Sequence, residues 1–386
     1  MNKLWEYRKI GDVCVVERGG SPRPIDKFIT VDEDGINWIK IGDTSDSMYI
    51  TETAQKIIPE GMKKSRYVKP GDFLLSNSMS FGRPYILKID GCIHDGWLVL
   101  RDEQEIFDKR FLYYYLSSKT TYEKFRSMAV GGVVNNLNSE MVRKVEVPVP
   151  SKTEQSDIAD LLDKLKQVLD SRKKELQLLD ELIKARFVEL FGDININDKN
   201  WDCEPLGELC TIVRGGSPRP IEQFLGGDVP WIKIGDATDG DSIYLSSTRE
   251  HIIQEGVKKS RLVKAGSLIF ANCGVSLGFA RIITFDGCIH DGWLAMEDID
   301  ERLDKVFLLQ ALNQMTEHFR AIAPAGTQPN LNTAIMKVCK QVIPPIELQR
   351  DFIRFANQVD KSKVAVQKAL DETQMLFDSL MQEYFN

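Results

Sequence analysis

The sequence predicts an α+β protein with two pseudo-symmetric domains separated by two long antiparallel helices that form a coiled coil. Three observations support this fold class. The chain repeats itself, each repeat contains short strand-like runs bounded by glycine and proline, and each repeat ends in a long helix with an apolar seam. A chain of 386 residues suits two domains of ordinary size plus connecting helices.

The repeat is close enough to see by eye. Arg-Gly-Gly-Ser-Pro-Arg-Pro-Ile stands at 18–25 and again at 214–221. The other shared stretches are Trp-Ile-Lys-Ile-Gly-Asp at 38–43 and 231–236, Lys-Lys-Ser-Arg at 63–66 and 258–261, Gly-Cys-Ile-His-Asp-Gly-Trp-Leu at 91–98 and 287–294, and Asn-Leu-Asn at 136–138 and 330–332. The chain is therefore a tandem duplication, with units of about 1–192 and 193–386.

Within the first repeat, β-type runs precede one predicted helix. We expect strands at 14–16, 38–41, 73–75, 85–87 and 97–100. A helix is expected from about 108 to 127, followed by a stretch rich in glycine and asparagine at 131–136. Prolines at 148 and 150 end a last strand before the long helix. The expected boundaries are a domain at 1–150, a helix at 151–192, a second domain at 193–344 and a second helix at 345–386.

Apolar residues in the two long helices alternate at four- and three-residue spacing. In the first helix they are Ile158, Leu162, Leu165, Leu169, Leu176, Leu179, Ile183 and Leu190, and in the second Phe352, Val359, Val366, Leu370, Phe377 and Leu380. The two sets lie 194 positions apart. A period of 3.5 residues is typical of a coiled coil, so we expect the helices to pack on each other over roughly 50 Å. The alternative is two amphipathic helices, each folded onto its own domain, for which a period nearer 3.6 is usual.

Composition is that of a soluble globular protein, with 42% hydrophobic and 28% charged residues. No apolar run is long enough for a membrane span, and the first residues do not form a signal peptide, so a cytoplasmic location is expected. Seven cysteines without a Cys-x-x-Cys pair predict reduced thiols, with neither a disulfide framework nor a metal site.

The net charge of −7 does not favour general binding to nucleic acid. Residues 1–150 carry 22 Lys/Arg against 21 Asp/Glu, whereas residues 193–344 carry 15 against 20. A surface that faces DNA would therefore have to be built locally, in loops.

Several loops hold side chains that suit such a surface. Arg23 and Arg219, on turns stiffened by proline, could make paired hydrogen bonds to a phosphate or to guanine. The cations at 63–66 and 258–261 suit phosphates: Lys63, Lys64, Arg66, Lys258, Lys259 and Arg261. The candidates for base edges are Asn77, Arg83, Asn135, Asn136, Asn272, Arg281, Gln328 and Asn330. The alternative interpretation is that these are structural turns and solvated charges.

Only two pairs hint at acid–base chemistry, His94 with Asp95 and His290 with Asp291. Adjacent residues on a strand point to opposite faces, so we expect neither pair to act as a catalytic dyad. The sequence also contains no Gly-x-x-x-x-Gly-Lys-Ser/Thr phosphate loop and no Asn-Pro-Pro-Tyr-type tetrapeptide of the kind that amino-methyltransferases use. We therefore expect no catalytic residues in this chain.

Taken with the duplication, the junctions between domain and helix carry a family resemblance. Each long helix follows prolines and begins with a glutamine: Pro148, Pro150 and Gln155 in the first repeat, and Pro344, Pro345 and Gln349 in the second. Over its full length the chain resembles the specificity subunit of a type I restriction-modification enzyme.

The resemblance implies a DNA reader that is not an enzyme. Each target-recognition domain, 1–150 or 193–344, would bind one half of a split site in double-stranded DNA. The helices would form the spacer. The implied partners are two methyltransferase subunits and motor-nuclease restriction subunits, and S-adenosylmethionine, ATP and Mg²⁺ would belong to those partners. The shared stretches predict a partly palindromic site, with asymmetry where 76–85 differs from 271–281 and 131–136 from 325–330. The alternative functions are a duplicated hydrolase that uses the His-Asp pairs and a coiled-coil scaffold without affinity for DNA.

Overall fold

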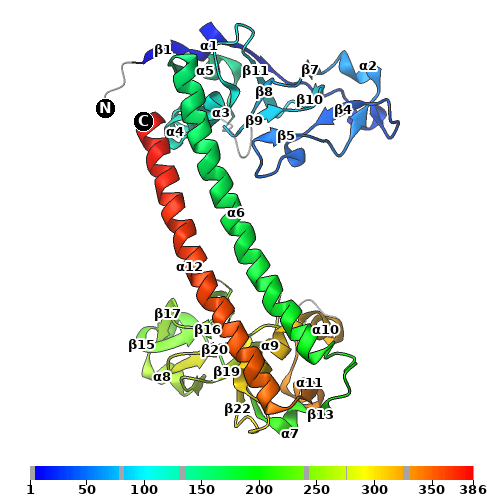
Figure 1. The fold of residues 1–386 in the computed structure, drawn as a ribbon, viewed down its shortest axis with the longest axis vertical. Helices are drawn as coiled ribbons and strands as arrows, with labels where there is room; N and C mark the ends of the chain where they lie inside the picture. The colour runs from blue at the N-terminus through cyan, green and yellow to red at the C-terminus, as the bar shows by residue number, and fades with distance from the viewer. Residues whose placement is uncertain are drawn as a thin grey trace. The chain divides into compact units, whose positions relative to one another are not determined.

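A computed structural model of the chain describes residues 5–77, 82–129, 136–238, 243–274, 276–324 and 330–385. It divides into two compact units, Met1–Lys173 with Lys368–Asn386, and Lys174–Gln367. Each unit contains one globular domain and one half of each long helix, α6 (Lys152–Phe191) and α12 (Ile346–Phe385) (Figure 1).

The first domain contains two sheets and a short strand pair. One sheet has the order β2 (Val15–Arg18), β11 (Trp97–Arg101), β8 (Phe73–Ser76), β9 (Pro84–Leu87) and β5 (Tyr49–Ile50). The other has the order β3 (Ile29–Thr30), β6 (Lys56–Ile57), β4 (Ile36–Ile39), β10 (Gly91–Ile93) and β7 (Arg66–Val68). Strand β1 (Glu6–Lys9) pairs antiparallel with β12 (Glu146–Val149). The helices are α1 (Ile10–Val13), α2 (Pro59–Met62), α3 (Lys109–Ser117), α4 (Lys119–Ala129) and α5 (Ser139–Arg143), with 3₁₀ turns at Ile25–Lys27 and Ile41–Asp43.

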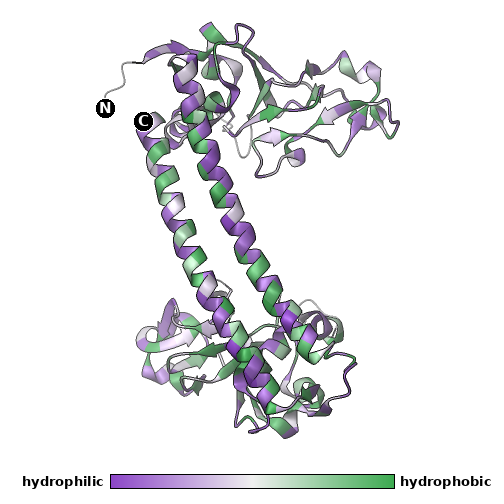
Figure 2. Ribbon diagram, in the orientation of Figure 1, coloured by the Kyte–Doolittle hydropathy of each residue, from purple (hydrophilic) through white to green (hydrophobic). Residues whose placement is uncertain are grey.

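Side-chain alternation explains how the first sheet is covered on both faces. Phe73 and Leu75 of β8 join a core with α3, α4 and the start of α6, whereas Leu74 between them joins the core shared with the second sheet. Successive residues of a strand point to opposite faces, so one apolar run serves both cores. Figure 2 shows the apolar residues on these strands and in stripes along the long helices.

The five strand predictions are confirmed, with ends that shift by at most two residues. The single helix predicted over 108–127 is wrong, because α3 and α4 meet at an extended residue, Ser118, with φ −65° and ψ 149°. The buried Ser118 hydroxyl accepts from the backbone N–H of Thr121, at 3.2 Å, and so caps the first turn of α4. Serine favours such a cap over a helix interior, and this explains the break.

The second domain repeats the first. Its larger sheet has the order β14 (Thr211–Arg214), β22 (Trp293–Glu297), β19 (Leu268–Ala271), β20 (Ala280–Ile283) and β16 (Tyr244–Leu245). The other has the order β17 (Glu250–Ile252), β15 (Leu225–Ile232), β21 (Gly287–Ile289) and β18 (Arg261–Val263), and β13 (Asp202–Pro205) pairs with β23 (Lys340–Ile343). The helices are α7 (Leu206–Leu209), α8 (Gln254–Val257), α9 (Lys305–Gln314), α10 (Thr316–Ile322) and α11 (Thr333–Val338), with 3₁₀ turns at Ile221–Gln223 and Ile234–Asp236.

The long helices run antiparallel within each unit. In the first unit Ile158 and Leu162, near the start of α6, share a core with Phe385 at the end of α12. In the second unit Ile183, near the end of α6, shares a core with Phe352, near the start of α12. Every predicted seam residue is buried or partly buried, so the coiled-coil seam is confirmed. The seam pattern alone did not predict that Phe187 and Phe191 also turn inward, against Phe307 of the second domain.

A buried glutamine bonds each long helix to its domain. The Gln155 side-chain oxygen accepts from the Asp108 N–H at 2.7 Å, and its amide donates to the carbonyls of Ile106, at 3.2 Å, and Pro150, at 2.9 Å. Gln349 makes the same three bonds in the second domain, to Asp304 N–H at 2.8 Å, Arg302 O at 2.9 Å and Pro344 O at 2.7 Å. Both side chains are nearly inaccessible, so these bonds form away from solvent.

Candidate nucleic-acid interface

Three of the identical stretches in each repeat converge on one turn. In the first domain this turn, residues 94–96, connects β10 to β11. The N–H groups of Gly19 and Gly20 donate to the carbonyls of Trp97, at 2.9 Å, and Ile93, at 3.1 Å. The Ser65 hydroxyl also donates to Ile93 O, at 3.0 Å. Three segments far apart in the sequence are thereby tied together.

Glycine is needed where the first segment crosses the turn. A Cβ atom on Gly19 would lie 2.2 Å from the carbonyl oxygen of His94, and one on Gly215 would lie 2.1 Å from the carbonyl oxygen of His290. Neither carbonyl is the end of a flexible side chain, so any larger residue would force the backbone apart. The Gly-Gly pair therefore permits close backbone approach and does not provide a flexible arm.

Asp95 lies at the centre of this arrangement. Its carboxylate accepts from the Ser21 hydroxyl at 2.8 Å, pairs with Arg23 Nη2 at 3.2 Å, and lies 3.0 Å from His94 Nε2. The Arg18 Nε donates to the Asp95 carbonyl oxygen at 3.2 Å. We call these five residues the Asp95 cluster.

The cluster favours the ionised form of Asp95. Partial burial of the carboxyl group opposes ionisation, but the hydrogen bond from Ser21 and the charges of His94 and Arg23 outweigh it. The pKa of Asp95 is therefore lowered. A carboxylate that stays charged keeps Arg23 in place, while the arginine side chain remains 80% exposed. The cation is held at the surface but is still accessible to a ligand.

The second domain repeats this geometry almost without change. The distances to Asp291 are 2.8 Å from the Ser217 hydroxyl, 3.3 Å from Arg219 Nη2 and 3.0 Å from His290 Nε2. The Arg214 Nε donates to the Asp291 carbonyl at 3.1 Å. Burial lowers the pKa of His290; Asp291 opposes this, and Lys233, Arg219 and Arg214 add to it. The pKa of Asp291 is lowered for the same reasons as that of Asp95.

The expectation that histidine and aspartate cannot face each other is wrong. His94 and Asp95 lie on a turn, not on a strand, and the turn brings the two side chains into contact. Catalysis is still not favoured, because His94 Nδ1 accepts from the Gly96 N–H at 2.9 Å while Nε2 faces Asp95. Neither ring nitrogen is left to take a proton from a nucleophile. The nearby Ser21 hydroxyl also donates to the carboxylate, not to the imidazole.

The predicted phosphate-binding cations lie around each cluster. Lys63 and Lys64 are exposed, and Lys64 Nζ lies 5.3 Å from the ring centre of Phe28. Lys258 and Lys259 are likewise exposed, and Lys259 lies 4.6 Å from the ring centre of Phe224. Each ring restricts the lysine beside it, so these cations are partly ordered before a ligand arrives.

One arginine of each set differs between the domains. Arg66 pairs with Glu17 at 3.1 Å, and Arg101 pairs with the same carboxylate. Val213 occupies the place of Glu17 in the second repeat, and Arg261 has no ion-pair partner within the described ranges. Glu297 occupies the place of Arg101, so the second domain loses a cation as well as an anion here, and among the described residues Arg261 lacks the carboxylate partner that Arg66 has.

Two of the asparagines predicted to read bases lie inside the protein. Asn77 and Asn272 are 1% and 0% exposed. Asn77 Nδ2 donates to Asp95 O at 2.9 Å, whereas Asn272 Nδ2 donates to Leu331 O at 3.1 Å. In this structure they position the turn and the chain beside it, which corrects the prediction that they face a duplex.

The remaining candidates divide between surface and interior. Arg83 is exposed, and Asn136 and Asn330 are partly buried. Arg281 is partly buried, donates to its neighbour Ala280 O at 2.8 Å and lies over the Phe279 ring. Asn135 and Gln328 lie outside the described residues.

Sequence analysis did not select the residues that hold each cluster together. Ser21 and Arg18, with their counterparts in the second domain, appeared there only within shared stretches, and Asp95 and Asp291 only as members of the His-Asp pairs. The available signal was their identity in both repeats. Across the described residues no group of His, Cys, Asp or Glu could hold a metal ion. Nor does any helix in that part of the chain have the length and apolarity to cross a membrane.

Comparison with known proteins places the whole chain. A family model described as the type I restriction modification DNA specificity domain matches residues 2–181 and 198–373. The MjaIX specificity subunit of Methanocaldococcus jannaschii is 23% identical over 98% of this chain and 92% of its own length. The EcoKI specificity subunit of Escherichia coli K12 is 22% identical over 99% and 88%.

Solved structures share the fold. A chain from a type I restriction-modification system superposes with a TM-score of 0.67 at 17% identity, covering 99% of this chain and 97% of that one. The S subunit of such a system from M. genitalium gives 0.55 at 17% identity, covering 100% and 97%. The repeat, the two domains with a coiled coil and the match over most of the sequence lead to one conclusion: the chain belongs to the family of type I restriction-modification specificity subunits.

Proposed function

We propose that this chain reads a bipartite DNA site, one half-site for each domain, and positions methyltransferase and motor-nuclease subunits on it. Two methyltransferase subunits would bind each chain. Methyl transfer and DNA cleavage, with S-adenosylmethionine, ATP and Mg²⁺, would take place in those partners, inside the cell that holds the DNA. The long helices would set the number of unread base pairs between the half-sites.

One observation carries the proposal. The Asp95 cluster and its copy around Asp291 present an exposed arginine from the same constellation, with matching distances that differ by at most 0.1 Å. Two lysines lie close by in each domain. A chain with a net charge of −7 has little general attraction for DNA, so two matching basic surfaces favour two local contacts with a duplex.

The pattern of identity and difference predicts the form of the site. Identical clusters favour the same contacts in both half-sites, which would then be near-inverted copies. Residues 76–85 and 271–281 differ in length and sequence, and asymmetry is expected where those loops reach. The bipartite site is thus expected to be split and partly palindromic.

The hydrolase alternative has less support than DNA reading. In the second domain Cys273 lies near the His290–Asp291 pair, but burial and the charge of Asp291 raise the pKa of its thiol. A protonated thiol is a weak nucleophile, and Cys273 has no cysteine counterpart in the first repeat.

Methylation-sensitive sequencing of DNA treated with the assembled methyltransferase tests the proposal. The expected result is a split site with related half-sites, bound more tightly by the complex than by the isolated chain, whose charge limits counterion release. Exchanging 76–85 for 271–281 should make the site more symmetric, at about 1–3 kcal/mol of discrimination per altered base contact. A continuous site, or half-sites unrelated in sequence, would contradict this reading of the clusters.

A further inference from the structure

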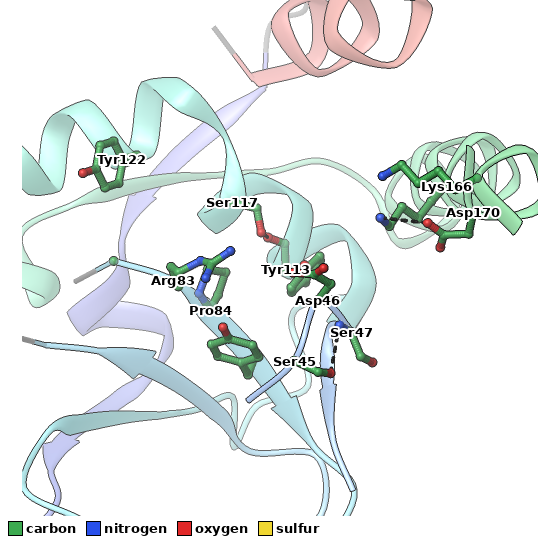
Figure 3. Close-up of a pocket in the computed structure, with 13 residues that line it drawn as sticks. Ser45, Asp46, Ser47, Arg83, Pro84, Tyr113, Ser117, Tyr122, Lys166 and Asp170 are labelled. Carbon is green, nitrogen blue, oxygen red and sulfur yellow. Dashed lines mark hydrogen bonds and ion pairs between the residues drawn. The ribbon is translucent and has the colours of Figure 1, made fainter. Parts of the chain in front are cut away.

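A pocket of about 770 Å³ opens beside the start of β9 in the first unit. Arg83 lines it from the position just before that strand, Tyr113 from α3, and Lys166, Asp170 and Lys173 from α6. Figure 3 shows Arg83 on the side of the domain and Lys166 on the facing helix, with Tyr113 between them. We call this cavity the Arg83 pocket.

The charges around the pocket favour an anion. Lys166 is neutralised by Asp170, at 3.2 Å. Arg83 and Lys173 are exposed and have no ion-pair partner in the part of the chain that the structure describes. Asp46 supplies the remaining carboxylate among the lining residues, and serine and tyrosine hydroxyls of the globular domain add hydrogen-bond donors. Guanidinium, ammonium and hydroxyl donors are the groups that hold phosphate oxygens in protein–DNA contacts.

The second unit does not repeat this set. Phe279 occupies the place of Arg83, directly after the glycine shared by both loops. Asp360 and Gln367 lie 194 positions after Lys166 and Lys173, at the places those lysines hold in the repeat. Phe279 packs edge-on against Trp293, with ring centres 5.6 Å apart. The cations of the Arg83 pocket are therefore not part of the structure that both repeats share.

We propose that the Arg83 pocket binds a phosphate group of the DNA backbone beside the first half-site, an inference that rests on the proposed function. Arg83 and Lys173 would supply the charge, and Tyr113 would form one wall. The contact reads no base, because phosphate oxygens are the same at every step of the duplex. It would give the first half-site an electrostatic contact that the second does not have.

The test measures how the binding constant of the assembled methyltransferase for its mapped site depends on salt. Arg83→Ala and Lys173→Ala are each expected to reduce the slope of log K against log[salt] by about 0.9, the loss for one phosphate contact. In ethylation interference, complexes of either variant should no longer be sensitive to ethylation of one phosphate near the first half-site. The order of preference among base-substituted sites should stay unchanged. Arg83→Lys keeps the charge and should keep the slope, which separates a lost contact from a misfolded loop.

Lys164→Ala is the matched control, because Lys164 is an exposed cation of α6 outside the pocket, and it should leave the slope unchanged. Unchanged slopes and footprints for both pocket variants, with wild-type binding still site-specific, would overturn this inference alone. If the pocket variants assemble more weakly with the methyltransferase in the absence of DNA, the inference is also overturned, since the pocket would then hold a protein partner. A wild-type complex with no site-specific binding would instead refute the proposed function.

Discussion

Replacing Gln155 by leucine should detach the start of α6 from the first domain. The substitution removes three hydrogen bonds and leaves the Asp108 N–H and the carbonyls of Ile106 and Pro150 without their partner, at a place where leucine offers none. Each polar group left unpaired in the interior costs about 1–2 kcal/mol. We therefore expect the free energy of unfolding to fall by roughly 3–6 kcal/mol, less whatever water recovers.

Urea denaturation measures this loss, and amide hydrogen exchange locates it. The Asp108 amide should exchange faster in the variant, because its acceptor is gone. Gln177→Leu is the control, since that glutamine lies on the same helix, is exposed and, among the described residues, bonds through its side chain to Glu181 alone, so a change within about 0.5 kcal/mol is expected. Gln349→Leu should reproduce the loss in the second domain. A loss below about 1 kcal/mol with unchanged exchange at Asp108 would refute the reasoning.

Three other perturbations have defined outcomes. The pKa of Asp95 is lower in the folded state, so the stability that its ionised form contributes is complete above the unfolded pKa near 3.8 and is lost as pH falls through the folded pKa. Asp95→Asn should therefore flatten the acid limb of a plot of unfolding free energy against pH. An unchanged acid limb would contradict this. Leu165→Asp, in the seam, should lower the free energy of unfolding by about 2 kcal/mol or more, because it buries a carboxylate. Leu178 is exposed, so Leu178→Asp should change that free energy little. Equal effects of the two substitutions would show that the seam is not buried at Leu165. Gly19→Ala places a Cβ 2.2 Å from a carbonyl oxygen and should lower the free energy of unfolding by about 1–3 kcal/mol in a denaturation experiment. Gly42→Ala is the control, because the space around Gly42 is open, and it should be nearly neutral. A Gly19→Ala variant as stable as the wild type would disprove the close approach.

The sequence by itself determined the features of this protein that depend on the order and spacing of residues within the chain. Duplication appears as matching letters, and the coiled-coil seam as a period, because both depend only on spacing within the chain. Ile158 and Phe352 are buried as the period predicted, and each strand predicted in the first domain is present.

Only the tertiary structure decided which polar residues meet. Ser21 and Asp95 are 74 positions apart, and their hydrogen bond exists because two backbone segments cross at Gly19, which no local pattern encodes. For the same reason Asn77, in a sequence typical of an exposed loop, is buried behind that crossing. Propensity and period are set by neighbours in sequence, whereas burial and hydrogen-bond partners are set by segments that folding brings together. The stretches that are identical in both repeats contain the residues of each cluster, but the path of the folded chain brings them together at a surface where an arginine is held in place.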